Sequence, residues 1–297
     1  MSLQPMPIAS AIRSGTRVYD SYSAIDNRID RSIRVRPAAR SSTMVNAQVA
    51  ADMFWLGKNE YSRNGDFPPL RLPFPDVWIE WTMPETFWAE GEWHELPVDG
   101  YRQFFALATC IDPSESSGCP EGTHSAIQVD GGWMEPGGVY IPAGLAFANL
   151  DERGRLIGGR DNGDVFDGVV GISADADLMA YISLLHPAFL AIGLMNCSNV
   201  KTEAESFKSR SSNRLARKAI PKLDYHTIVL PGSRSGGSGT SERQGVMPQH
   251  KVRGHFKTFT VERPLMGRHV GTYWWGWNVR GNKKNGITVT DYKVGAA

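Results

Sequence analysis

YRQFFALATCI (Tyr101–Ile111), HSAIQVDGGWM (His124–Met134) and GVYIPAGLAFAN (Gly138–Asn149) make up the part of the sequence that decides the fold. Each run is rich in apolar, aromatic and β-branched residues, and turn-forming residues separate the runs. Strands that follow one another closely along a chain usually pair as antiparallel neighbours. These runs therefore predict an antiparallel sheet.

Two other segments have the apolar spacing of helices. In the longer one, apolar residues recur at steps of four, three, four and three, which places them on one face of a helix; they are Leu178, Ile182, Leu185, Phe189 and Ile192. This spacing predicts a long core helix near residues 174–196, capped by Ser173 and kinked at Pro187. A second helix is predicted from Ser42 or Thr43 to about Tyr61.

A second group of strands is predicted towards the end of the chain, at residues 225–230, 250–260, 272–280 and 287–294. Residues 281–286 are expected to form the turn of the last hairpin. The predicted fold class is therefore α+β, with predominantly antiparallel sheet, the long core helix near residues 174–196 and a C-terminal three-stranded antiparallel unit.

The overall composition is that of a folded protein. The chain has 297 residues, of which 41% are apolar, and this is enough to build a core. Its three cysteines are too few for a disulfide framework or a zinc site, although Cys110 and Cys119 could form a bridge in an oxidising compartment. Neither a secretion signal nor a clear membrane span is found, so we expect a reduced, cytoplasmic protein without membrane partners.

The charge is divided unequally along the chain. Residues 201–297 hold 18 lysines and arginines against 6 aspartates and glutamates, whereas residues 1–200 hold 14 against 25. The net charge of +1 is thus the sum of +12 on residues 201–297 and −11 on residues 1–200. We predict an Arg-rich flexible arm (1–41), an acidic α+β body (42–200) and a basic C-terminal sheet subdomain (201–297).

The arm and part of the acidic body have complementary charge. The arm contains seven arginines, and residues 76–99 contain seven acids and four tryptophans but no lysine or arginine. One hypothesis is therefore that these two segments assemble copies of the chain or capture a host protein.

The basic C-terminal segment is the predicted binding surface. On the strand 250–260, alternation places Lys251, Arg253, His255 and Lys257 on one face, at intervals of roughly 6.6–6.8 Å that suit an extended phosphate backbone. Aromatic residues of the strand 272–280 could stack on bases. The complete predicted nucleic-acid or polyanion site is Lys251, Arg253, His255, Lys257, Tyr273, Trp275, Trp277, Arg280, Lys283 and Lys284.

Two other interpretations of these residues are open. A cationic row is commonly the solvated face of a sheet, and a tryptophan-rich strand commonly belongs to a core. Alternatively, His255 with Arg253 could catalyse metal-independent ribonuclease chemistry, for which a second histidine is usually needed, with His226 and His269 as candidates. No metal site and no cofactor fingerprint is predicted.

The segment Gln249–Phe256, QHKVRGHF, resembles a group of uncharacterised proteins encoded by phages and by bacterial genomes. The chain also resembles this group at Asn196–Val200, Tyr225–His226, Val279–Gly281 and Asp291–Val294. The resemblance covers the final third of the chain. It implies a phage or mobile-element context, and hence a host cytoplasm, but no catalytic role, because the group has no established activity.

Overall fold

The structure is a computed structural model. It describes fourteen segments, namely residues 42–56, 68–84, 86–89, 92–95, 103–115, 119–134, 140–157, 169–172, 178–206, 224–231, 248–252, 254–275, 278–280 and 282–288. These segments belong to two compact units. The first comprises the described residues up to Asn196 together with Lys201 to Val229, and the second comprises Cys197–Val200 together with the described residues from Leu230 onward.

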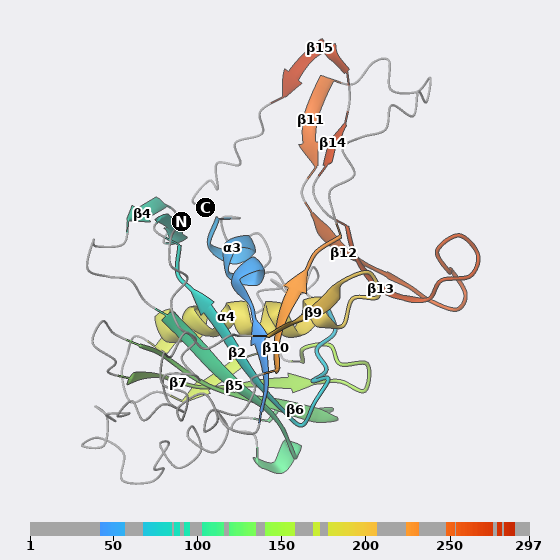
Figure 1. The fold of residues 1–297 in the computed structure, drawn as a ribbon. Helices are drawn as coiled ribbons and strands as arrows, with labels where there is room; N and C mark the ends of the chain where they lie inside the picture. The colour runs from blue at the N-terminus through green and yellow to red at the C-terminus, as the bar shows by residue number, and fades with distance from the viewer. Residues whose placement is uncertain are drawn as a thin grey trace. The chain divides into compact units, whose positions relative to one another are not determined.

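An eight-stranded sheet forms the centre of the first unit, with strand order β8-β7-β6-β5-β2-β1-β10-β9 (Figure 1). Its strands are β1 (Thr43–Asn46), β2 (Asp76–Thr82), β5 (Gln103–Ile111), β6 (Ser125–Met134), β7 (Tyr140–Leu150), β8 (Val169–Ile172), β9 (Lys201–Ser206) and β10 (Asp224–Val229). The strands predicted at Tyr101–Ile111, His124–Met134 and Gly138–Asn149 are confirmed as β5, β6 and β7. Residues 201–206, where the sequence analysis predicts no strand, form β9.

The predicted fold class is wrong, because the sheet is mixed. Strand β1 pairs in parallel with both β2 and β10. Parallel neighbours need a crossover connection, which is usually a helix. Helix α3 (Gln48–Leu56) lies in the connection from β1 to β2, so that β1, α3 and β2 form a β-α-β unit. The pairs of this sheet that do not involve β1 are antiparallel.

The helix predicted from Ser42 or Thr43 to about Tyr61 begins later than expected. Its first turn is occupied by β1, in which Met44 and Val45 are buried between two neighbouring strands. Asn46 then starts the helix, because its Oδ1 accepts a hydrogen bond of 2.9 Å from the backbone N–H of Gln48. The residues predicted beyond Leu56 lie outside the described part of the chain.

Helix α4 (Leu178–Met195) and helix α3 both pack on the sheet (Figure 1). Leu185 of α4 lies so close to Gly131 of β6 that a side chain there would collide with it. The ring of Phe54 in α3 stacks on His186 in α4, with centroids 4.3 Å apart. The fold is thus a mixed sheet with two helices rather than a mainly antiparallel sheet built on one long core helix. The predicted cap, Ser173, lies outside the described residues.

The second unit also differs from the predicted three-stranded antiparallel unit. It contains two small sheets: β12 (His255–Phe259) pairs with β13 (Gly271–Trp275), while β11 (Pro248–Val252) lies between β14 (Asn278–Arg280) and β15 (Asn282–Thr288). The predicted strands 250–260 and 272–280 are therefore each divided between two sheets. The predicted turn at 281–286 falls largely within β15, which pairs with β11 in parallel.

Two further strands, β3 (Thr86–Ala89) and β4 (Glu92–Glu95), form a hairpin of their own in the acidic stretch 76–99. Strand β2 belongs to the same stretch, and its Glu80 is buried and accepts a hydrogen bond of 2.7 Å from the indole N–H of Trp78. Not all of the acidic residues of this stretch are therefore available to a partner. Among the described helices, none has the length and apolar character needed to cross a membrane.

Candidate functional site

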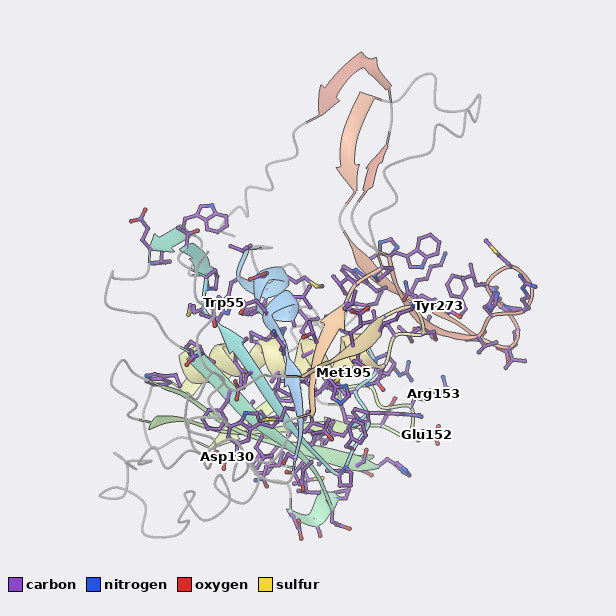
Figure 2. The ribbon with its side chains drawn as sticks, viewed as in Figure 1. Trp55, Asp130, Glu152, Arg153, Met195 and Tyr273 are labelled. Atoms are coloured by element: carbon purple, nitrogen blue, oxygen red, sulfur yellow. The ribbon has the colours of Figure 1, made fainter. Side chains whose placement is uncertain are left out.

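The antiparallel pair β12–β13 contains four of the ten predicted site residues. Its register places His255 opposite Trp275 and Lys257 opposite Tyr273. Since side chains at directly opposed positions point to the same side of a sheet, these four residues share one face, which we call the hairpin face. Tyr273 is labelled in Figure 2.

The opposite face of β12–β13 is packed. Trp274 is only 5% exposed, and its ring lies 4.7 Å from that of Phe256. The hydroxyl groups of Thr258 and Thr272 are 2.9 Å apart across the two strands. The two sides of the hairpin thus differ as expected for a ribbon with one face in a core and one face in solvent.

Asn199 makes two hydrogen bonds to the backbone of Trp274 in β13. Its Nδ2 donates to the carbonyl oxygen at 2.6 Å, and its Oδ1 accepts from the N–H at 2.8 Å. A further bond of 2.8 Å joins the N–H of Ser198 to the carbonyl oxygen of Thr272. These contacts hold β13 in place, so the hairpin face has a defined support.

Cationic and aromatic groups alternate on the hairpin face. The imidazole of His255 and the ring of Trp275 are nearly parallel, with an interplanar angle of 17° and centroids 6.5 Å apart. The Nζ of Lys257 lies 6.0 Å from the Trp275 centroid and 5.0 Å from that of Phe259. Trp275 is 39% exposed, so an indole surface with a cation beside it is open to solvent.

Four of the other predicted site residues belong to a different sheet from this face. Lys251 is in β11, Arg280 is in β14, and Lys283 and Lys284 are in β15, all in the other small sheet of the second unit. The predicted continuous cationic row along one strand is therefore wrong, because the strand ends at Val252 and a new one begins at His255. Arg253 and Trp277 lie outside the described residues.

The geometry gives the ribonuclease hypothesis little support. His255 faces Trp275 across the hairpin, while His269 lies in the loop between β12 and β13, where its Nε2 accepts a hydrogen bond of 3.1 Å from Nε of Arg268. His226 belongs to β10 in the first unit. Neither candidate histidine is the residue opposite His255 in the strand register, and the role of Arg253 stays a prediction.

The loop at residues 260–270 was missed by the sequence reasoning. Its exposed apolar residues are Val261 (78%), Met266 (82%) and Val270 (48%). The exposed cations Arg263 and Arg268 accompany them. The signal was present in the sequence, because apolar residues on either side of a glycine between two strands mark a turn whose side chains have no core to enter.

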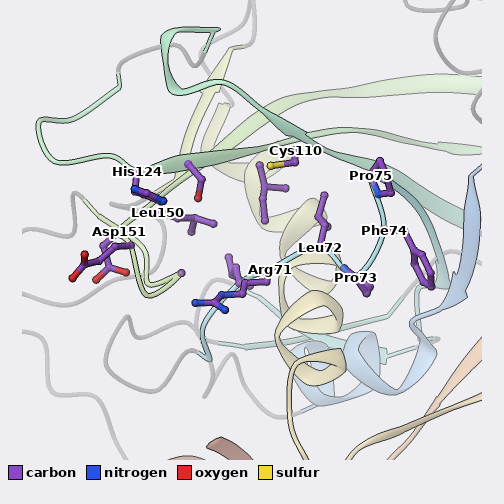
Figure 3. Close-up of a pocket in the computed structure, with 14 residues that line it drawn as sticks. Arg71, Leu72, Pro73, Phe74, Pro75, Cys110, His124, Leu150 and Asp151 are labelled. Atoms are coloured by element: carbon purple, nitrogen blue, oxygen red, sulfur yellow. The ribbon is translucent and has the colours of Figure 1, made fainter.

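The first unit contains a separate pocket with a volume of about 520 Å3 (Figure 3). One wall is the segment Leu70–Pro75, and the other includes Cys110 and Ile127 of the sheet. Arg71, His124, Asp151 and Glu152 add polar groups of both charges to a mainly apolar lining, as is usual for a small-molecule pocket. No sequence pattern had indicated this pocket.

Asp151 at the edge of this pocket holds a turn together. Its Oδ1 accepts hydrogen bonds of 2.8 Å from the N–H groups of Arg153 and Arg155, and its Oδ2 lies 3.0 Å from Nε of Arg155. Burial alone would raise the pKa of Asp151, but these backbone and side-chain hydrogen bonds and the Arg155 charge lower it below its usual value. Both carboxylate oxygens of Asp151 therefore stabilise the turn at residues 151–155.

The described residues contain no cluster of three or more histidines, cysteines, aspartates or glutamates that could hold a metal ion. The Arg-rich arm lies outside the described residues, so its role in assembly stays a prediction. We found no match to this chain among known protein families, curated proteins or solved structures.

Proposed function

We propose that the second unit binds nucleic acid through the hairpin face, with Lys257 and His255 next to phosphates and Trp275 and Tyr273 stacked on bases. The observation that supports this proposal most directly is the placement of Lys257 and Trp275 side by side on one exposed face. Single-stranded nucleic acid is bound by this combination of a positive groove and aromatic platforms.

The electrostatics of the hairpin are consistent with a polyanionic partner. Within the part of the chain that the structure describes, no carboxylate forms an ion pair with Lys257, Arg263 or Arg268. The same loop also holds the exposed Glu262, so that residues 260–270 have two arginines against one glutamate. The phage-type context and the host cytoplasm implied by the sequence resemblance belong to this proposal.

The test is binding of fluorescently labelled single-stranded oligonucleotides, measured by anisotropy at about 50 mM and about 200 mM salt. The affinity of the wild-type protein should fall steeply as salt rises, because counterions released from phosphates drive binding. Lys257→Ala should weaken binding and reduce the slope of log K against log salt by about 0.7–0.9. Trp275→Ala should cost about 1–3 kcal/mol at either salt concentration.

Two matched variants serve as controls. Lys201→Ala removes one exposed lysine from β9, and Trp93→Ala removes a 50% exposed tryptophan from β4, both in the first unit. Neither should change the affinity or its salt dependence. The proposal is overturned if wild-type binding is indifferent to salt, or if the control substitutions weaken binding as much as those on the hairpin face.

A further inference from the structure

The loop between β12 and β13 has a defined shape at its end. The N–H of Leu265 donates to the carbonyl oxygen of His269 at 2.8 Å, and the reverse bond from His269 to Leu265 measures 3.0 Å. A third bond of 3.2 Å joins the N–H of Arg268 to the carbonyl oxygen of Leu265. The hairpin thus ends in a closed turn, which we call the tip, formed by residues 265–269.

Met266 occupies the tip in an unfavourable conformation. Its φ is 53°, and it is the one non-glycine residue with positive φ among the described residues. A Cβ atom disfavours this conformation, and glycine or asparagine adopts it more readily. Met266 is also 82% exposed, so it gains no burial that would offset the strain. A strained and exposed apolar residue is understandable if its side chain is used outside the folded chain.

The loop that carries Met266 has a net positive charge, with two arginines against one glutamate, Glu262. Arg268 follows it in the tip and Arg263 precedes it in the loop, and both are exposed. Lys257 lies on the strand that leads to the loop. An apolar side chain presented between arginines is complementary to nucleic acid, whose stacked bases are apolar and whose backbone is anionic.

We propose that Met266 is a wedge that enters between adjacent base pairs of duplex nucleic acid, while Arg263 and Arg268 contact the flanking phosphates. This inference rests on the proposed function and adds a second mode of contact to it. A methionine suits the role, because its unbranched and polarizable side chain adapts to a narrow gap. Proteins that insert such wedges unstack one base step and kink the duplex.

A lipid surface is a poorer partner for the tip. Interfacial membrane anchors combine a basic face with large apolar residues such as tryptophan, phenylalanine and leucine. The exposed apolar groups of the loop are two valines and one methionine. This apolar surface is too small to anchor a protein stably, since even a single acyl chain gives only reversible membrane binding.

The experiment uses the full chain and a duplex of about 25 base pairs, long enough for a bend to be measured. Dyes at its two ends report bending by energy transfer, and 2-aminopurine in the duplex reports unstacking. At saturating protein, the wild type should bend the duplex by about 20–90° and raise the 2-aminopurine fluorescence. Met266→Gly, which keeps the backbone conformation but removes the wedge, should abolish both signals. Met266→Leu should restore much of them.

The control is Leu56→Ala, which removes a 45% exposed apolar side chain from α3 and should leave both signals unchanged. Salt-dependent binding without bending, or bending that persists in Met266→Gly, overturns the wedge but leaves the proposed function intact. A wild type that binds no nucleic acid overturns both. Flotation with phosphatidylcholine–phosphatidylserine vesicles that depends on Met266 would assign the tip to a membrane and also overturn the wedge.

Discussion

The indole of Trp274 lies directly over Gly254, so that a Cβ atom at Gly254 would come within 2.6 Å of two carbons of the ring. Gly254 precedes β12, and Trp274 is the buried residue of β13. The hairpin that presents the proposed binding face therefore depends on the absence of a side chain at this position.

We predict that Gly254→Ala destabilises the hairpin by about 1–3 kcal/mol, the usual cost of overpacking. Amide hydrogen exchange in β12 and β13 should become faster, while exchange in the eight-stranded sheet should not change. The double variant Gly254→Ala with Trp274→Phe should recover part of the loss, because the smaller ring leaves space for the new methyl group. If the destabilisation of the double variant equals the sum of those of the two single variants, the contact between Gly254 and Trp274 is not the cause of the loss.

Gln48 ties the start of α3 to the end of β2. Its Nε2 donates to the carbonyl oxygen of Thr82 at 3.0 Å and to Oδ1 of Asp52 at 2.9 Å, while its Oε1 accepts from the N–H of Thr82 at 2.9 Å. We predict that Gln48→Ala lowers the free energy of unfolding by about 1–3 kcal/mol, measured with urea. Gln48→Glu should be at least as harmful, since a carboxylate cannot donate to Thr82. If Gln48→Glu leaves the free energy of unfolding unchanged, the hydrogen bond that Gln48 donates to Thr82 does not stabilise the fold.

Cys197 should differ from the other two cysteines in its reactivity. It is buried, whereas Cys110 and Cys119 are exposed. Burial raises the pKa of the Cys197 thiol from 9.0 to about 12. At pH 8 an aromatic disulfide reagent should therefore modify two thiols of the folded protein rapidly, and the third only after unfolding. Cys197→Ser should leave the rapid phase unchanged.

The same pKa shift sets a pH dependence of stability. Below pH 9 the thiol is protonated in both the folded and the unfolded chain, so Cys197 makes its full contribution to the free energy of unfolding. Between pH 9 and about 12 the unfolded chain loses the proton first, and stability contributed by Cys197 falls as pH rises. Cys197→Ala should show a smaller decline in unfolding free energy over this range.

The ribonuclease hypothesis makes a separate prediction for His255. If it holds, the protein cleaves RNA in the presence of a chelator, and His255→Ala abolishes cleavage while nucleic-acid binding is reduced only modestly. Persistence of the full cleavage rate in that variant would exclude His255 as the acid–base residue. Since Trp275 is the residue opposite His255, while His269 lies in the loop and His226 in the first unit, we expect binding without cleavage.

Local patterns in the sequence predicted parts of the fold but not its pairing. The runs that became β5, β6 and β7 were recognisable because each is long and mostly apolar. Strand β1 was not, since it has only four residues and its Val45 continues the apolar spacing of α3. One of its two parallel neighbours, β10, comes from a distant part of the chain, and periodicity carries no information about such a partner.

The candidate site was predictable to a similar extent. Alternation predicted that His255 and Lys257 share a face, but only the register showed that Tyr273 and Trp275 lie on that face too. Gly254 was treated as an ordinary position within a strand. Gly254 lies instead between β11 and β12, where the ring of Trp274 approaches its backbone closely, and Lys251 belongs to a different sheet from Lys257.

The position of β1 determines the order in which the first unit can be completed during synthesis. β1 is made early, yet one of its two neighbours, β10, emerges from the ribosome only after α4 and β9. Until then, one edge of β1 is an unpaired template for other nascent chains. A fragment cut at residue 200, where the charge changes sign, would keep that edge permanently open, whereas one that continues through Val229 would close it.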